Sequence, residues 1–174
     1  DCAARNAKQL GLADRFEPLH LDVLELRDDT RIRPESFDQV LANPPYRPLG
    51  QGREPSAQGL KQARFELQAG LSDFLRAGSY ALKNRGTLTL IHLAVRLGFV
   101  FQSVSAAGLE VQRMRCVHSS AHSRAKLVLI QARKNGKPGL EIEPPLILYE
   151  RDRDGRTRMT RQALEFCPFL RCNP

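Results

Sequence analysis

The sequence predicts an α/β protein with a sheet whose strands run mostly parallel. Short apolar segments alternate with longer amphipathic ones, as expected of strands that alternate with helices. The segment 87–93 is a nearly continuous apolar run, which is typical of a strand buried on both faces. Segments 109–117 and 125–132 are separated by a short polar stretch and predict an antiparallel pair in the second half of the chain.

The remaining elements follow from local patterns. We expect a helix end over 1–12, strands at 15–22 and 37–42, a long helix from about 59 to 83, a helix from about 94 to 107 and an edge strand at 142–149. The long helix carries its apolar residues on one broad face and ends at Asn84-Arg85-Gly86, a turn sequence. The alternating charges at 151–156 surround a glycine and predict a solvated hairpin turn.

The composition predicts one globular domain spanning residues 1–174. The hydrophobic share is 41% and the charged share 26%, and no apolar run approaches the length of a membrane span. The four cysteines show neither C-x-x-C nor a metal-ligand spacing; they are Cys2, Cys116, Cys167 and Cys172. We therefore expect reduced thiols, a cytoplasmic protein and no metal.

The charge favours a nucleic-acid partner. The formal net charge is +8, and 21 of the 27 basic residues are arginine. Arginine forms bidentate phosphate contacts that lysine cannot form, and a strongly basic domain has the electrostatic footprint of a nucleic-acid binder. Because many other proteins are basic, the charge gains weight only together with a motif.

Such a motif, Asn43-Pro44-Pro45-Tyr46, follows the predicted strand 37–42 directly. Open α/β sheets bind their ligands at the carboxyl ends of their strands. Each proline fixes φ and removes a backbone donor, so the Pro44 carbonyl is available to a ligand. The Asn43 side-chain oxygen can accept a hydrogen bond beside it, and the Tyr46 ring can lie against a planar group.

These groups suit the methylation of a planar amine. The nitrogen of an exocyclic amine or an amide is a poor nucleophile because its lone pair is delocalised. Two acceptors that hold its hydrogens would favour a tetrahedral nitrogen and free the lone pair to attack a methyl sulfonium, through positioning and electrostatics rather than a strong base. The alternative is a proline-rich turn after an edge strand, with Tyr46 capping the core.

The motif resembles motif IV of the class I S-adenosylmethionine-dependent amino-methyltransferases. The segments that follow it, Arg47-Pro48-Leu49-Gly50, Arg53-Glu54-Pro55 and Ala63-Arg64-Phe65-Glu66, resemble those of the small-domain tRNA adenine N6-methyltransferases, which act on adenine 37 of a valine tRNA. The tail at 145–149 and 159–164 is similar to that group's closing strand and ending. Met159 stands in place of the usual Tyr, and Gln162 in place of the usual Glu.

The resemblance implies a Rossmann-like sheet with strand order 3-2-1-4-5-7-6. Segments 15–22, 37–42 and 87–93 would be strands 3, 4 and 5. The sequence contains no G-x-G-x-G cofactor turn, and residues 1–12 match the helix after strand 2. We therefore expect strands 1 and 2 to be missing, so that strand 3 has no partner beside strand 4. The expected molecule is an N-terminally truncated piece, inactive alone, of a chain roughly 60 to 80 residues longer.

The resemblance also implies roles for single residues. S-adenosylmethionine is the expected cofactor, held by Asp22 and Asn43, and the expected catalytic residues are Asn43, Pro44, Pro45 and Tyr46. From the residues alone, Asp22 could instead cap a turn or a helix. The residues expected to contact substrate RNA are Arg47, Arg53, Lys61 and Arg64. Their alternative is solvated loop charge or, for Arg64, an ion pair with Glu54 or Glu66.

Three histidines, His92, His118 and His122, are interpreted more simply as structural or surface residues than as metal ligands or catalytic groups. His118 and His122 lie with Arg124 and Lys126 in a polar, serine-rich hairpin, which favours a turn, facing RNA or solvent, over a metal site. His92 lies inside the apolar segment 87–93. A histidine there is more often a hydrogen-bonded core residue than a catalytic one.

The sequence thus predicts an S-adenosylmethionine-dependent N-methyltransferase acting on adenine N6 of tRNA. The target base would be extruded into a pocket floored by Tyr46. Three alternatives stay open: an N5-glutamine methyltransferase of release factors, a guanine N2-methyltransferase of ribosomal RNA, and an RNA-binding module without activity.

Overall fold

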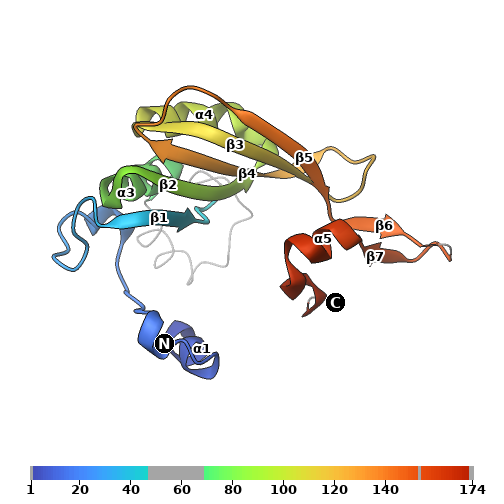
Figure 1. Ribbon diagram of the computed structural model, residues 1–174, viewed down its shortest axis with the longest axis horizontal. Coiled ribbons are helices and arrows are strands. Elements are labelled where there is room, and N and C mark those ends of the chain that lie inside the picture. Colours follow the sequence, from blue (N-terminus) through green and yellow to red (C-terminus); the bar gives the residue numbers. More distant parts are fainter. Residues whose placement is uncertain (1, 47–68, 153, 173–174) are drawn as a thin grey trace, which may run out of the picture.

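The computed structural model describes residues 2–46, 69–152 and 154–172 (Figure 1). Its main sheet has the strand order β1-β2-β4-β3-β5. These strands are β1 (Phe37–Ala42), β2 (Leu82–Leu93), β3 (Leu109–His118), β4 (Ala125–Lys134) and β5 (Glu141–Ile147). β1 is parallel to β2, and β5 to β3, whereas β4 is antiparallel to both β2 and β3. The predicted α/β class is confirmed.

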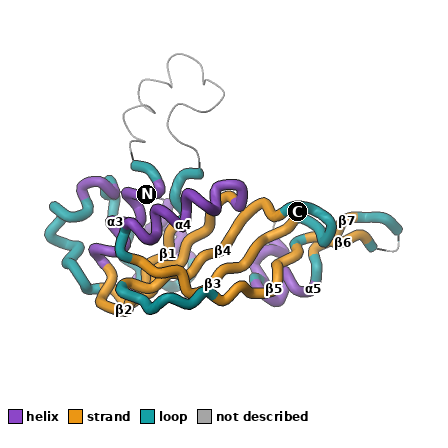
Figure 2. Tube along the Cα trace, turned by 90° about the horizontal axis from the view of Figure 1, so that it is seen from above, coloured by secondary structure: helices purple, strands orange, loops and turns teal. Residues whose placement is uncertain are grey.

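The described α-helices are α1 (Cys2–Gln9), α3 (Leu71–Ala81), α4 (Leu97–Ala106) and α5 (Arg161–Phe166). Of these, α3 and α4 form a layer on one face of the main sheet (Figure 2). α1 stands apart (Figure 1), and α5 contacts β5. α1 confirms the expected helix end, because Gly11 just after it has a φ of 68°, the left-handed conformation common there. None of the described helices is long and apolar enough to cross a membrane.

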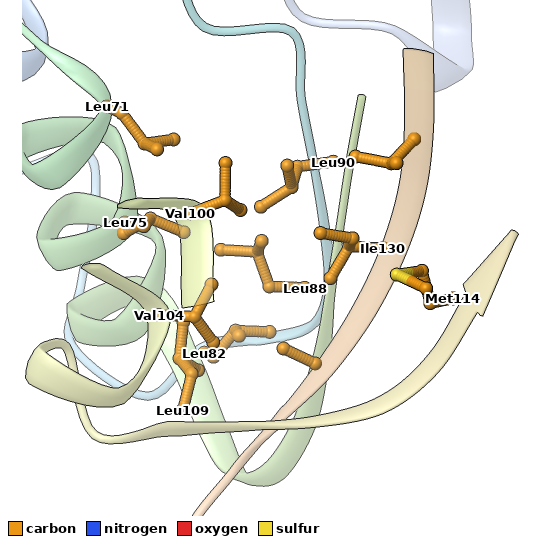
Figure 3. Packing of buried hydrophobic residues seen from close by; sticks show 12 residues of the cluster. Leu71, Leu75, Leu82, Leu88, Leu90, Val100, Val104, Leu109, Met114 and Ile130 are labelled. Carbon is orange, nitrogen blue, oxygen red and sulfur yellow. The ribbon is translucent and has the colours of Figure 1, made fainter. Parts of the chain in front are cut away.

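The core lies between this helix layer and the two central strands (Figure 3). Along β2, buried residues alternate with half-exposed ones, so that Leu88 and Leu90 face the helices. They pack with Ile130 of β4, Leu75 of α3 and Val100 of α4. The close packing of α3 on the sheet leaves no room for a side chain at Gly78, where a Cβ would lie 2.6 Å from Leu88 Cδ1.

The observed order β1-β2-β4-β3 corresponds to strands 4-5-7-6 of the expected sheet. The predicted antiparallel pair is confirmed as β3 and β4. The predicted edge strand is β5, but it ends at Ile147, and Tyr149 begins a separate ribbon of β6 (Tyr149–Arg151) and β7 (Thr157–Met159). That ribbon closes around the predicted hairpin turn.

The predicted long helix is confirmed only over α3, because β2 already begins at Leu82, and Ala69 and Gly70 before α3 are not helical. Its expected first part, 59–68, falls outside the described residues. The turn predicted at 84–86 is wrong: this segment lies within β2, where Arg85 has a φ of 67° and the register with β1 shifts.

The strand predicted at 15–22 is wrong. This segment runs between 3-10 turns at Ala13–Arg15 and Val23–Glu25 and joins no described strand. Extended backbone becomes a strand only when a neighbour exchanges hydrogen bonds with it. In the described part of the chain β1 pairs with β2 alone, and Leu41 of β1 is 81% exposed.

Candidate active site

The motif Asn43-Pro44-Pro45-Tyr46 begins directly after β1, at the carboxyl end of this strand. Ala42 is paired with Leu90, and β2 continues to Leu93, so the motif lies alongside the end of β2. Asn43 is exposed, Pro44 is buried, and Pro45 and Tyr46 are partly buried. The structure therefore places the four expected catalytic residues together, with the asparagine amide at the surface.

Tyr46 is held by contacts on three sides. Its hydroxyl donates a hydrogen bond to Asn43 Oδ1 at 2.9 Å. Its ring meets the His92 ring edge-to-face, with 5.3 Å between centroids and 67° between planes. Its backbone carbonyl accepts a hydrogen bond from Arg96 Nη1 at 3.3 Å. Tyr46 thus contacts the core on one side, as the alternative interpretation requires, yet it remains partly exposed.

Asn43 keeps the capacity to bind a donor. A carbonyl-type oxygen has two lone pairs, and the Tyr46 hydroxyl uses one of those on Asn43 Oδ1. The exposed amide can therefore accept a second hydrogen bond, from a ligand amine. Its orientation is set by the Tyr46 hydroxyl.

His92 is the unusual residue of this region. It is fully buried, and neither ring nitrogen has a hydrogen-bond partner among the described residues. Burial lowers the pKa of His92, the Arg96 guanidinium lowers it further, and the Leu93 backbone opposes this lowering in part. The prediction of a core residue is confirmed, and the described residues supply no hydrogen-bond partner within normal geometry to its ring nitrogens.

Asp22 adopts the capping role. Its carboxylate Oδ1 accepts a hydrogen bond from the Leu24 backbone N–H at 3.0 Å, at the start of the Val23–Glu25 turn. The side chain is exposed, so it is accessible to a ligand. A contact with a cofactor stays a prediction.

The predicted RNA-contacting residues Arg47, Arg53, Lys61 and Arg64 all lie outside the described residues. Their roles, and the alternative pairing of Arg64 with Glu54 or Glu66, stay predictions.

The serine-rich segment between β3 and β4 forms the expected turn. His118 Nδ1 lies 2.7 Å from the Ser123 carbonyl oxygen, and the Ser123 hydroxyl bonds the Ser120 backbone. His122 is exposed. Among the described residues, no group of three or more His, Cys, Asp or Glu is placed to hold a metal ion.

Comparison with known proteins gives a result at the level of fold. No family model and no curated protein matches the chain. The solved structure of a predicted O-methyltransferase, Atu636 from Agrobacterium tumefaciens, aligns over 95% of this chain and 68% of its own, with a TM-score of 0.65 and 23% identity. A sarcosine dimethylglycine methyltransferase structure from Galdieria sulphuraria aligns over 79% of this chain and 65% of its own, with a TM-score of 0.50 and 11% identity. The fold is that of the class I methyltransferases.

The class I fold does not by itself define a reaction. The [4+2]-cyclase SpnF also aligns, over 79% of this chain and 62% of its own, with a TM-score of 0.50 and 13% identity. One fold hosts several chemistries, so that function has to be argued from the site. In this class I frame, the Asn43–Tyr46 segment follows strand 4.

Sequence reasoning missed two residues of the site, His92 and Arg96. His92 lies near the end of β2 and Arg96 in the turn after it, and both contact Tyr46. The sequence placed His92 in the core but did not indicate its contact with the motif. No sequence signal indicated that Arg96 binds the motif's backbone, because that contact spans 50 residues of sequence.

Proposed function

We propose that this chain is the substrate-binding part of an S-adenosylmethionine-dependent N-methyltransferase that acts on adenine N6 of tRNA. One observation carries the proposal. At the carboxyl end of β1, an exposed asparagine amide is joined by a 2.9 Å hydrogen bond to a partly exposed tyrosine. An amide acceptor beside an aromatic ring is what an amine on a flat ring needs in order to be held and oriented.

The residues of the site act on the amine by orientation. Asn43 Oδ1 has a lone pair left for one hydrogen of the target amine. With the Pro44 carbonyl accepting the second hydrogen, the two bonds would draw the amine hydrogens out of the ring plane and concentrate the lone pair on nitrogen. Because the Asn43 amide is already oriented by Tyr46, it needs little reorganisation during the reaction. A base stacked on the Tyr46 ring would present that amine at a fixed distance from Asn43.

The donor set also fits the proposed cofactor. S-adenosylmethionine, when bound, supplies an electrophilic methyl carbon. Its adenine amino group and its ammonium group are hydrogen-bond donors that the exposed Asp22 carboxylate can accept, and its carboxylate is an acceptor to which the Asn43 Nδ2 group can donate. These two residues would therefore hold it. Apolar side chains could not form these hydrogen bonds with the polar groups of the cofactor.

The choice of tRNA rests on charge and on the segments after the motif. A net charge of +8 that is mostly arginine suits the phosphates of RNA, whose unstacked bases are recognised by stacking. The resemblance of segments 47–66 to tRNA adenine N6-methyltransferases points to adenine among the possible bases.

Incubating the full-length protein with labelled S-adenosylmethionine and a panel of acceptors tests this proposal. The panel contains unmodified tRNA, ribosomal RNA and a release factor, and nucleoside or peptide mass analysis locates the methyl group. We expect N6-methyladenosine in tRNA. Methyl transfer to guanine N2 or to a glutamine amide, with none to tRNA, would contradict the proposal.

Calorimetric titration with S-adenosylmethionine and with tRNA distinguishes a methyltransferase from the remaining alternative, an RNA-binding module without activity. If the full-length protein binds tRNA but does not bind S-adenosylmethionine, the methyltransferase proposal is wrong. We expect both to bind.

A further inference from the structure

Residues at and just after the end of β2 contact Tyr46 of the motif. His92 is the last buried residue of β2, and Arg96 closes the short turn at Ala94–Arg96 that leads into α4. One residue contacts the Tyr46 ring and the other binds the Tyr46 carbonyl. Arg96 is itself held, since its guanidinium lies 4.6 Å from the centroid of the Phe99 ring on α4. Tyr46 is therefore anchored to the helix layer as well as to Asn43.

We propose that His92 and Arg96 are positioning residues of the amine site, which fix the angle of the Tyr46 ring and, through its hydroxyl, the orientation of the Asn43 amide. This inference rests on the proposed function and deepens it. Neither residue needs to touch the substrate. His92 has no exposed surface, so it acts through Tyr46.

The burial of His92 without hydrogen bonds supports this role. The neighbouring residues on the same face of β2 are Leu88 and Leu90, and a third leucine would fill this position without burying two polar nitrogens. An imidazole, by contrast, offers a flat, polarised ring whose edge can meet an aromatic face. The observed edge-to-face contact with Tyr46 needs a flat ring at this position, which leucine cannot supply.

The charge state of His92 fits the contact. Among the described residues, the titratable or charged groups that contact it are Arg96 from the turn after β2 and Tyr46 from the motif. Burial first, and Arg96 second, lower the pKa of His92, so the ring is neutral at physiological pH. Protonation would place a second cation beside Arg96 in a buried position. The support of Tyr46 should therefore weaken on acidification.

Steady-state kinetics of the full-length protein test the inference. His92→Leu removes the flat ring that meets Tyr46, and Arg96→Met removes the donor to the Tyr46 carbonyl. We expect each of these two variants to lower kcat roughly 10- to 100-fold, since small misplacement of reacting groups has effects of this size, with KM for tRNA little changed. His92→Phe, which keeps a flat ring, should retain most of the activity at neutral pH. Arg96→Lys, which keeps a donor, should recover most of the activity. His92→Phe should also flatten the acid limb of the kcat profile.

Val104→Ala is the matched control, because Val104 is fully buried in the same core on α4 but is absent from the contacts to Tyr46. It should lower thermal stability and leave kcat and its pH profile unchanged. An equal loss of kcat in this variant, or unchanged kcat in both His92→Leu and Arg96→Met, would overturn the inference.

A spectroscopic readout separates this inference from the proposed function. The chain has three tyrosines, so the Tyr46 ring signal of ¹³C-tyrosine-labelled protein can be assigned with Tyr46→Phe. It should shift with pH in the wild type and lose that shift in His92→Phe. If the coupling is observed but the wild type methylates nothing, the proposed function fails and the contact stands. If the Tyr46 signal is the same in the wild type, in the His92 variants and in Arg96→Met, the positioning role fails.

Discussion

Tyr46 joins the exposed part of the site to the buried part. Its hydroxyl orients Asn43, while its ring and carbonyl contact His92 and Arg96. A tyrosine in this place can do two things, which are to orient the amide and to offer a stacking surface. Substitutions that remove one function at a time should therefore give different kinetic results.

Removing only the hydroxyl should affect catalysis more than binding. Tyr46→Phe loses the bond to Asn43 Oδ1, which is worth about 1 kcal/mol, and we expect kcat to fall about fivefold with RNA affinity unchanged. Tyr46→Ala also loses the stacking surface, worth about 1–3 kcal/mol per base, and should weaken RNA binding as well. Kinetics and filter binding on both variants check this. Equal RNA affinities of the two variants would argue against stacking on Tyr46.

His92 should make the protein less stable in acid. Its pKa is lowered in the folded state, so below the ordinary value of about 6.5 the unfolded chain binds the proton more readily. The stability contribution is present above that pH and is lost as the pH falls towards the folded-state pKa. Urea unfolding at pH 7.5 and 5.5 should show a smaller loss of stability in His92→Phe than in the wild type. Val104→Ala should keep the wild-type difference.

At this scale the sequence predicted the motif but not its support. Asn43 and Tyr46 are adjacent along the chain, so a local pattern reveals them. The contacts of His92 and Arg96 with Tyr46 depend on how β1 and β2 align. The lack of a hydrogen-bond partner for His92 depends on which side chains surround it. Neither can be inferred before the sheet is assembled.

The helices and strands were predictable from the sequence where the local hydrophobic pattern alone determines the element. The buried run of β2 and the alternating pair β3 and β4 were predictable because their hydrophobic periods are regular. The segment 15–22 has a strand-like composition but no described strand beside it. A segment forms a strand only beside another strand, and its own composition does not show whether such a neighbour exists.

The contact between α3 and the sheet depends on Gly78. A Cβ there would lie 2.6 Å from Leu88 Cδ1 and 3.4 Å from Val40 Cγ1, both parts of the packed core. We expect Gly78→Val to reduce the free energy of unfolding by about 1–3 kcal/mol through overpacking. Thermal or urea unfolding measures this.

Gly98 on α4 provides the matched control. A Cβ at this position meets nothing within 4 Å, so Gly98→Val changes helix propensity without a clash. It should leave stability unchanged or slightly raised. If both valine variants lose the same stability, the close approach of α3 to the sheet is not what Gly78 provides.

On the scale of the whole molecule, the described sheet has the strand order 4-5-7-6 of a class I fold, and the charge of the chain suits the RNA partner that we propose. The chain has a net charge of +8. With about four phosphate contacts to a flexible RNA strand, raising salt from 50 to 200 mM should weaken tRNA binding roughly 50-fold. Fluorescence anisotropy over this range measures the slope. A nearly flat salt dependence would favour the release-factor alternative over RNA.

The central claim is that Asn43 orients a substrate amine, and a pair of substitutions at this residue tests it most directly. In the full-length protein, Asn43→Asp keeps an acceptor oxygen, while Asn43→Ala removes it. Single-turnover methylation of tRNA should be retained in part by Asn43→Asp and abolished in Asn43→Ala, with tRNA affinity unchanged in both. Gln102→Ala, which truncates an exposed amide on α4, should behave as wild type. Wild-type methylation by Asn43→Ala would contradict the account.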